Sequence, residues 1–139
     1  MSDPKSEVAG VVERFLDAVS REDRQGIRAH HAQDVLMFDF PNTVRGMAEY
    51  DKTWDFFFAN RRGPITFSPS GLQASASDGV GFVTCEVHCD GTTAGPLDFR
   101  LTVGLVKREG RWEITHEHHS LPTTDERYIP KKTRVTGGS

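Results

Sequence analysis

The residues best suited to chemistry stand near the end of the chain, in the segment His116-Glu117-His118-His119. Apolar and polar residues alternate through this region, which is typical of a β-strand with one buried face. Strict alternation places His116 and His118 on the same face as the apolar Trp112 and Ile114, and the other two residues of the segment on the opposite face. The pattern therefore predicts that these two histidines meet the core.

Three roles are open to His116 and His118, because imidazole titrates near neutral pH. They can be hydrogen-bonded structural residues, pocket groups that contact a ligand or move a proton, or a metal-binding pair about 6–7 Å apart on one strand. A metal would need a third ligand from Asp39, Glu86 or His88, and the spacing of these residues enforces no such set. We therefore expect no metal and no cofactor.

Asp39 and Arg100 are the other candidates for chemistry. Asp39 ends an apolar run and lies beside phenylalanines, where a carboxylate can serve as a general base; alternatively, it satisfies the turn at Phe40–Thr43. Arg100 is either a surface partner of Asp98 or Glu86, or a fork that binds a carboxylate inside a cavity. The sequence leaves both alternatives open.

These residues are positioned by helices in the first half of the chain and strands in the second. Apolar residues spaced three and four positions apart predict helices. Alternating apolar and polar residues between turn signals predict strands. The predicted helices cover residues 1–22, 25–31 and 47–60, and the predicted strands 34–40, 65–76, 80–89, 97–108 and 111–120. Helices followed by a meander indicate an α+β fold, with the helices packed on one face of an antiparallel sheet. His30 and His31 are expected as solvated residues at a helix end.

The third predicted helix carries a broad aromatic stripe, which faces the core or forms one wall of an apolar cavity. Its members are Met47, Tyr50, Trp54, Phe57 and Phe58. Cys85 and Cys89 are expected to be unbridged, because four residues on one strand separate them by about 13 Å. Buried, inert thiols are the favoured interpretation, and reactive thiols the alternative.

Length and charge limit the classes of function. The chain has 139 residues, 27% of them charged, and a formal net charge of −3. This charge argues against a nucleic-acid partner, and no apolar run is long enough to span a membrane. We predict a single domain over residues 1–122, a loose tail over 123–139 and a cytoplasmic location.

The order of these elements and the closing motif Gly110-Arg111-Trp112…His116-Glu117-His118-His119-Ser120 resemble the nuclear transport factor 2-like superfamily. The closing motif most resembles the SnoaL-like group and the association domain of calcium/calmodulin-dependent kinase II. The resemblance to the superfamily, which includes the SnoaL-like and ketosteroid isomerase-like domains, covers roughly residues 5–122. It implies a curved sheet wrapped around three helices into a cone-shaped α+β barrel, with a pocket at the open end. It also implies pairing into a homodimer.

The resemblance assigns roles to single residues. Asp39 falls at the position of the proton-shuttling base, whereas Phe15 and Thr102 replace the two strong donors of the steroid isomerase oxyanion hole. Loss of those donors would remove several kcal/mol of transition-state stabilisation, so ketosteroid isomerisation itself is not expected. The same correspondence places Arg100 and Thr102 on the pocket side.

Two classes of function follow as hypotheses. In the first, an enzyme of the isomerase or cyclase type uses Asp39 as base and His118 or Arg100 to stabilise an oxyanion. Its apolar or acidic small-molecule substrate would contact Phe15, Trp54, Phe58, Thr102 and His116. In the second, the chain is a non-catalytic module that binds a small ligand or mediates oligomerisation.

Overall fold

The computed structural model describes residues 3–129. Along the chain its elements are α1 (Pro4–Ser20), α2 (Arg24–Ala29), β1 (His31–Phe38), β2 (Thr43–Arg45), α3 (Gly46–Ala59), β3 (Arg61–Ala76), β4 (Val80–Thr92), β5 (Leu97–Arg108), β6 (Arg111–Ser120) and the 3-10 helix η1 (Glu126–Tyr128). The predicted order of helices and strands is confirmed, and β2 is an addition to it.

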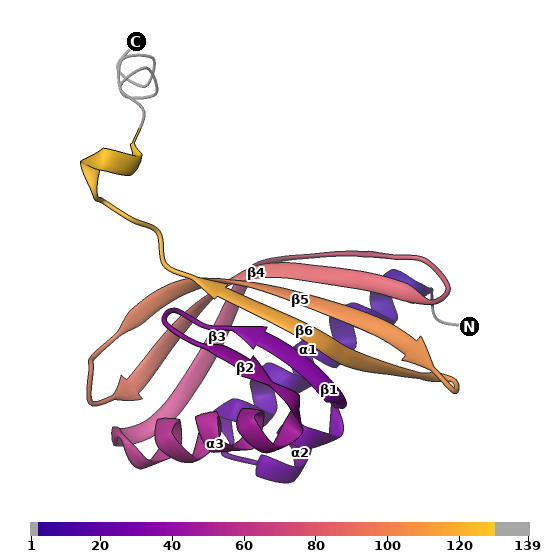
Figure 1. The fold of residues 1–139 in the computed structure, drawn as a ribbon, viewed down its shortest axis with the longest axis horizontal. Coiled ribbons are helices and arrows are strands. Elements are labelled where there is room, and N and C mark those ends of the chain that lie inside the picture. Colours follow the sequence, from indigo (N-terminus) through magenta and orange to yellow (C-terminus); the bar gives the residue numbers. More distant parts are fainter. Residues whose placement is uncertain (1–2, 130–139) are drawn as a thin grey trace.

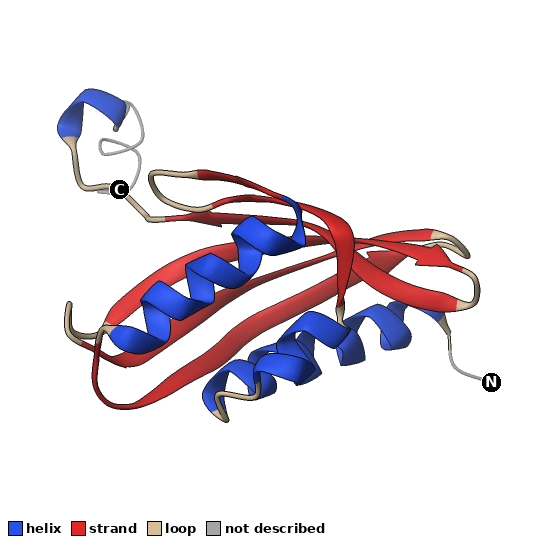
Figure 2. Ribbon diagram, turned by 60° about the horizontal axis from the view of Figure 1, so that its bottom comes forward, coloured by secondary structure: helices blue, strands red, loops and turns tan. Residues whose placement is uncertain are grey.

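A six-stranded curved sheet in the order β2-β1-β6-β5-β4-β3 forms the body of the molecule (Figure 1). The three main helices lie against one face of this sheet and leave the other face uncovered (Figure 2). The predicted α+β fold, a curved sheet wrapped around three helices, is confirmed. The sheet is mixed rather than wholly antiparallel, because β1 starts beside the start of β6 and runs parallel to it. It also stays open, with β2 and β3 as its edges, so the cone is not a closed barrel.

Local signals explain where the helices begin. The Asp3 carboxylate accepts a hydrogen bond from the Ser6 N–H at 2.9 Å at the start of α1. The Asp23 carboxylate does the same for the Gly26 N–H at 3.0 Å at the start of α2. Both satisfy backbone donors that have no partner within the helix. The apolar side of α1 then packs against β3 and β4, while α3 packs against β1 and β2.

Two local predictions for residues 30–45 are wrong. The first strand begins at His31 rather than residue 34, and His31 is 4% exposed instead of being a solvated or capping residue at a helix end. Its pairing with β6 draws the residue into the sheet. Residues Thr43–Arg45, expected partly as a turn, form β2 because the chain doubles back and pairs with β1.

The structure describes each end of the chain only in part. The part of the predicted tail that the structure describes leaves the sheet after β6 and includes η1, whereas residues 130–139 lie outside the described part (Figure 1). Residues 1 and 2 of the predicted first helix also lie outside it. Within residues 3–129 the helices are too short or too polar to cross a membrane.

One extra residue in β6 decides which side chains face the helices. Ile114 pairs with Leu105 of β5, and His116 pairs with Gly104, so Thr115 has no partner residue across the strands. The Thr115 hydroxyl instead contacts the carbonyl of Gly104 at 3.5 Å. Such a bulge reverses the alternation of side chains beyond it.

The bulge overturns the predicted facing of the histidine segment. Glu117 is fully buried and His119 is half-buried on the helix-covered face. His116 and His118 lie on the uncovered face, where His118 is exposed. The prediction assumed that every residue after Ile114 is paired, but Thr115 is not, so each later side chain faces the side opposite to the predicted one.

Arg100 and Thr102 also lie on the uncovered face. The buried residues of β5 are Phe99, Leu101, Val103 and Leu105, and the two polar residues between them are exposed. The expectation that Arg100 and Thr102 face the pocket is therefore corrected. A strand packed on helices by one face turns its apolar set toward them.

Candidate functional site

An apolar cavity of about 390 Å³ opens between α3, the turn after β1 and the concave face of the sheet. Its lining is mostly aromatic and sulfur-containing, with a few polar groups. The residues are Met37, Asp39, Phe40, Pro41, Asn42, Thr53, Trp54, Phe56, Phe57, Phe67, Cys89, Leu97, Phe99 and His119. No lysine or arginine is among these lining residues. A cavity of this size and composition suits a small, largely apolar molecule.

Aromatic packing holds one wall of this cavity rigid. Trp54 stacks on Phe58 with ring centroids 5.6 Å apart and meets Phe57 edge-on at 5.3 Å. Phe15 contacts Trp54 from behind at 6.3 Å and is 1% exposed. Of the three aromatic residues predicted to hold a ligand, only Trp54 lines the cavity. Phe15 and Phe58 support it from outside the lining.

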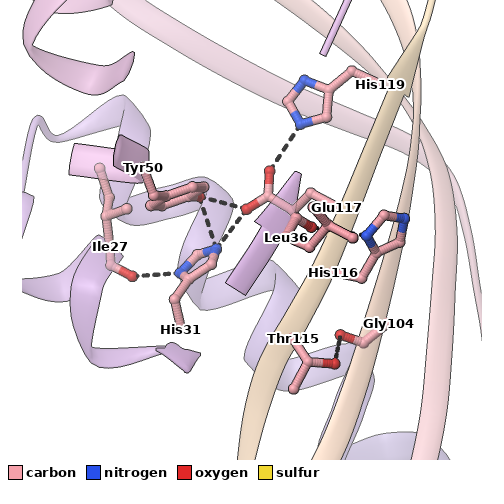
Figure 3. Close-up of polar contacts among 9 residues, drawn as sticks. All are labelled: Ile27, His31, Leu36, Tyr50, Gly104, Thr115, His116, Glu117 and His119. Carbon is pink, nitrogen blue, oxygen red and sulfur yellow. Dashed lines mark hydrogen bonds and ion pairs between the residues drawn. The ribbon is translucent and has the colours of Figure 1, made fainter. Parts of the chain in front are cut away.

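A buried polar network lies beside this cavity and centres on Glu117 (Figure 3). Its carboxylate oxygen Oε2 accepts a hydrogen bond from the Tyr50 hydroxyl and lies 2.5 Å from Nε2 of His31. The other oxygen, Oε1, lies 2.8 Å from Nε2 of His119. Glu117 thus joins β6 to β1 and α3 through side chains that are all largely shielded from solvent.

The contacts of His31 indicate where its protons lie. Its Nδ1 lies 2.7 Å from the Ile27 carbonyl oxygen, which can only accept, so Nδ1 carries a proton. Its Nε2 lies 2.5 Å from Oε2 of Glu117 and 2.7 Å from the Tyr50 hydroxyl oxygen. A second ring proton on Nε2, facing the ionised carboxylate, would make His31 an imidazolium and the two residues a buried ion pair.

Two pKa values in the network are displaced. Burial raises the pKa of Glu117, but hydrogen bonds from His119 and His31 outweigh burial, so this pKa lies below its ordinary value. Burial, reinforced by the adjacent Glu117 carboxylate, raises the pKa of Tyr50 well above its ordinary value. The buried Trp54 indole N–H has no hydrogen-bond partner within residues 3–129. Glu117 is therefore the anion of the network and Tyr50 a neutral donor.

His119 connects this network to the cavity. Its ring stacks on Phe99 with centroids 5.1 Å apart and planes 16° from parallel, and it lines the cavity wall. One ring nitrogen contacts Glu117, and the other points away from that residue (Figure 3). Among the described residues the second nitrogen has no hydrogen-bond partner. An oriented imidazole with one free nitrogen is suited to proton transfer.

Asp39 also lines the cavity, at the turn between β1 and β2. Its Oδ1 accepts a hydrogen bond from the Asn42 N–H at 2.7 Å, and its Oδ2 lies 3.4 Å from the Asn42 side-chain amide. This position is compatible with both interpretations of Asp39 from the sequence, a residue that satisfies its turn and a residue beside a binding cavity. The carboxylate stabilises its turn and stands at the edge of the cavity.

The other predicted site residues are distributed over the uncovered face of the sheet. Arg100 donates from Nε to the Ser120 hydroxyl at 3.2 Å and from Nη2 to the Leu121 carbonyl at 3.4 Å. His116 contacts the Leu36 carbonyl through Nδ1 at 2.8 Å. The rings of His116 and His118 are 6.3 Å apart. Thr102 is exposed on the same face. The sheet separates these four residues from the cavity.

Sequence reasoning missed Glu117, His31, Tyr50 and His119 as a unit. Tyr50 was recognised only as a member of the aromatic stripe. The sequence does contain a signal for Glu117 and His119, because they are two residues apart, share one face of the strand and adjoin the candidate residues His116 and His118. Their burial could not be read without the bulge at Thr115. Within the described residues, no three His, Cys, Asp or Glu side chains converge as a metal-binding group.

The fold is that of a cone-shaped α+β domain, and a buried acid–imidazole network lies beside its apolar cavity. A family profile for the SnoaL-like domain matches residues 8–124, so the chain belongs to the SnoaL-like family. No curated protein matches it in sequence.

Solved structures agree with this assignment. An NTF2-like protein of unknown function from Pseudomonas putida is 28% identical, with a TM-score of 0.80 over 88% of this chain and 89% of its own. A candidate ketosteroid isomerase from Shewanella frigidimarina is 23% identical, with a TM-score of 0.68 over 80% and 92%. A candidate scytalone dehydratase from Novosphingobium aromaticivorans is 14% identical, with a TM-score of 0.74 over 85% and 83%. The last two likenesses show the fold alone.

Proposed function

We propose that this protein is an enzyme of the isomerase or cyclase type that moves a proton on a small, largely apolar molecule. The observation that carries the proposal is His119, which lines the apolar cavity and is held by buried Glu117 at 2.8 Å. A carboxylate that orients an imidazole and stabilises its protonated form is a recurring arrangement for acid–base catalysis.

In the proposed mechanism, each residue of the network has a defined protonation state. Because His31 supplies a positive charge to Glu117, His119 can remain neutral and donate its Nε2–H to the carboxylate. The lone pair of its Nδ1 is then free to accept a proton from a substrate in the cavity. The imidazolium formed in this step is stabilised by Glu117 and can return the proton to another substrate atom.

Asp39 is the second proton-transfer candidate in this proposal, because it lines the same cavity as His119. Arg100 and His118 face away from the cavity and have no part in this mechanism within a single chain. Phe15 has no hydroxyl to serve a steroid isomerase oxyanion hole, so another substrate is proposed.

The test is exchange of acidic C–H protons in D₂O, followed by proton NMR over a panel of cyclic and aryl ketones. Wild-type protein should catalyse exchange in at least one bound ketone. His119→Gln should lower the rate by about 10²–10⁴-fold, the usual contribution of a general base. His118→Gln, altered on the uncovered face, is the matched control and should leave the rate unchanged. Equal rates in wild type and His119→Gln would overturn the proposal.

A ligand-binding module is the second candidate, favoured by the engagement of Asp39 with its own turn. Thermal shift would then show stabilisation by apolar ligands without any proton exchange. The absence of cationic lining residues makes an acidic ligand a poor fit for the cavity.

A homodimer through the uncovered face is proposed from its exposed aromatic residues. Phe38 is 36% exposed and Phe82 is 51% exposed. Light scattering that gives the mass of one chain would refute it. The cytoplasmic location remains a prediction from the sequence.

A further inference from the structure

A second cleft, of about 480 Å³, lies near the start of β6, whereas the apolar cavity lies near its end. Its wall combines residues from three elements that are distant in sequence. Arg14 comes from α1, His30 from the end of α2 and Arg111 from the start of β6. Trp112 forms an aromatic part of the same wall. This cleft is not used by the proposed reaction.

The cationic groups of the cleft lack acidic partners. Neither Arg14 nor the His30 ring has a hydrogen bond or ion pair with another described residue. Arg111 donates only to the Ala29 carbonyl at 3.3 Å. The carboxylate of Glu7, also in the wall, is engaged by the Trp112 indole N–H at 2.8 Å and lies 3.8 Å from Lys107 Nζ. Arg14 and Arg111 therefore form no ion pair among the described residues, and Glu7 is the one acidic residue among the described residues of the cleft wall.

The pKa of His30 responds to the positive charges around it. Burial lowers the pKa of His30, and the neighbouring charges of Arg14, His31 and Arg111 lower it further, while Asp23 acts in the opposite direction. Like charges that meet in one cleft repel each other, and an anion placed between them would remove that repulsion.

We infer that the cleft formed by Arg14, His30 and Arg111 binds an oxyanion, either a phosphate or a carboxylate group. Two guanidinium groups provide paired N–H donors that match the oxygens of either group. His30 adds a third donor once it is protonated. A dianionic phosphate should bind more tightly than a carboxylate because the cleft offers up to three positive charges.

The test is an NMR titration of the His30 ring protons in the full chain, at constant ionic strength set with sodium chloride. His30→Gln identifies the resonance. Inorganic phosphate should give a saturable shift and raise the His30 pKa, and acetate should do so more weakly. Acetate binding more tightly than phosphate would identify the group as a carboxylate.

The double variant Arg14→Gln/Arg111→Gln should weaken phosphate binding by at least about tenfold, as expected for loss of charge-assisted contacts. Arg100→Gln, an arginine on the uncovered face, is the matched control and should bind phosphate as wild type does. Both arginines of the double variant are exposed, so the fold should persist, and circular dichroism checks this. No saturable shift with either anion, or equal affinity in the double variant, would overturn the inference.

Discussion

Glu117 and His119 lie two residues apart on β6, and Oε1 of the first accepts a hydrogen bond from Nε2 of the second at 2.8 Å. Both side chains point to the helix-covered face, because residues two apart on a strand share a face. Glu117 reaches inward to His31 and Tyr50, and His119 reaches the cavity. The pair thus links a buried charge to a binding space.

Replacing Glu117 with Gln should reduce both stability and activity. The change leaves the His31 imidazolium without its anion in a fully buried place, and breaking a buried pair in this way costs about 3–5 kcal/mol. Urea unfolding measures the loss. Glu113→Gln, on the same strand and paired to Arg108 at 3.7 Å near the surface, is the control and should cost less than about 1 kcal/mol. Equal stability of the two variants would contradict the buried ion pair.

The stability contributed by Glu117 should depend on pH. Its pKa is lower in the folded protein than its ordinary value of 4.5, so the unfolded chain binds the proton more readily. The contribution is fully present above the unfolded pKa and is lost as pH falls through the folded value. The difference in unfolding free energy between wild type and Glu117→Gln should therefore stay constant from pH 7 to about 4.5 and shrink progressively as the pH is lowered further. A difference that stays constant below pH 4.5 would refute the shift.

Tyr50→Phe should destabilise the protein while leaving its packing intact. The substitution removes only the hydroxyl that donates to Glu117, and a hydrogen bond to a buried charged group contributes about 1–3 kcal/mol. Thermal and urea unfolding give the change. Tyr128→Phe, at a tyrosine that is 69% exposed, is the matched control and should be neutral. If Tyr50→Phe left the unfolding free energy unchanged, the Tyr50 hydroxyl would not stabilise the network.

The two cysteines should react slowly with iodoacetamide in the native protein. Burial raises the pKa of Cys85 and of Cys89 to about 11, and Asp90 contributes to the second shift. At pH 8 only about one thiol in a thousand would be a thiolate, the reactive form. Mass spectrometry of labelled protein should show both sites protected, and rapid labelling in urea. Native labelling at the urea rate would favour reactive thiols instead.

Much of the fold follows from local patterns. The apolar spacing of α1, the aromatic stripe of α3 and the alternation of β5 each predict their element, since these signals depend only on neighbouring residues. Asp39 and Trp54, two of the residues that the sequence suggests for a site, both line the cavity, and their functional roles remain predictions.

The centre of the site could not be derived in the same way. Glu117 is separated by 86 residues from His31 and by 67 from Tyr50, so its burial depends on partners that no local pattern identifies. A buried acid is normally improbable unless it is paired, and the pairing appears only in three dimensions. The family resemblance places Arg100 and Thr102 on the pocket side, and the sequence offers no check on this placement, because a polar set on a strand does not reveal which face the helices cover.

The bulge at Thr115 has a consequence for how related chains are compared. If Thr115 were paired in the strand and the bulge were lost, strict alternation would turn His116 and His118 toward the helices and Glu117 and His119 away from them, although no side-chain type would have changed. A chain with the same closing motif but without the bulge would therefore present different histidines to the cavity. The bulge, and not the motif alone, decides which histidine of β6 reaches the cavity in this protein.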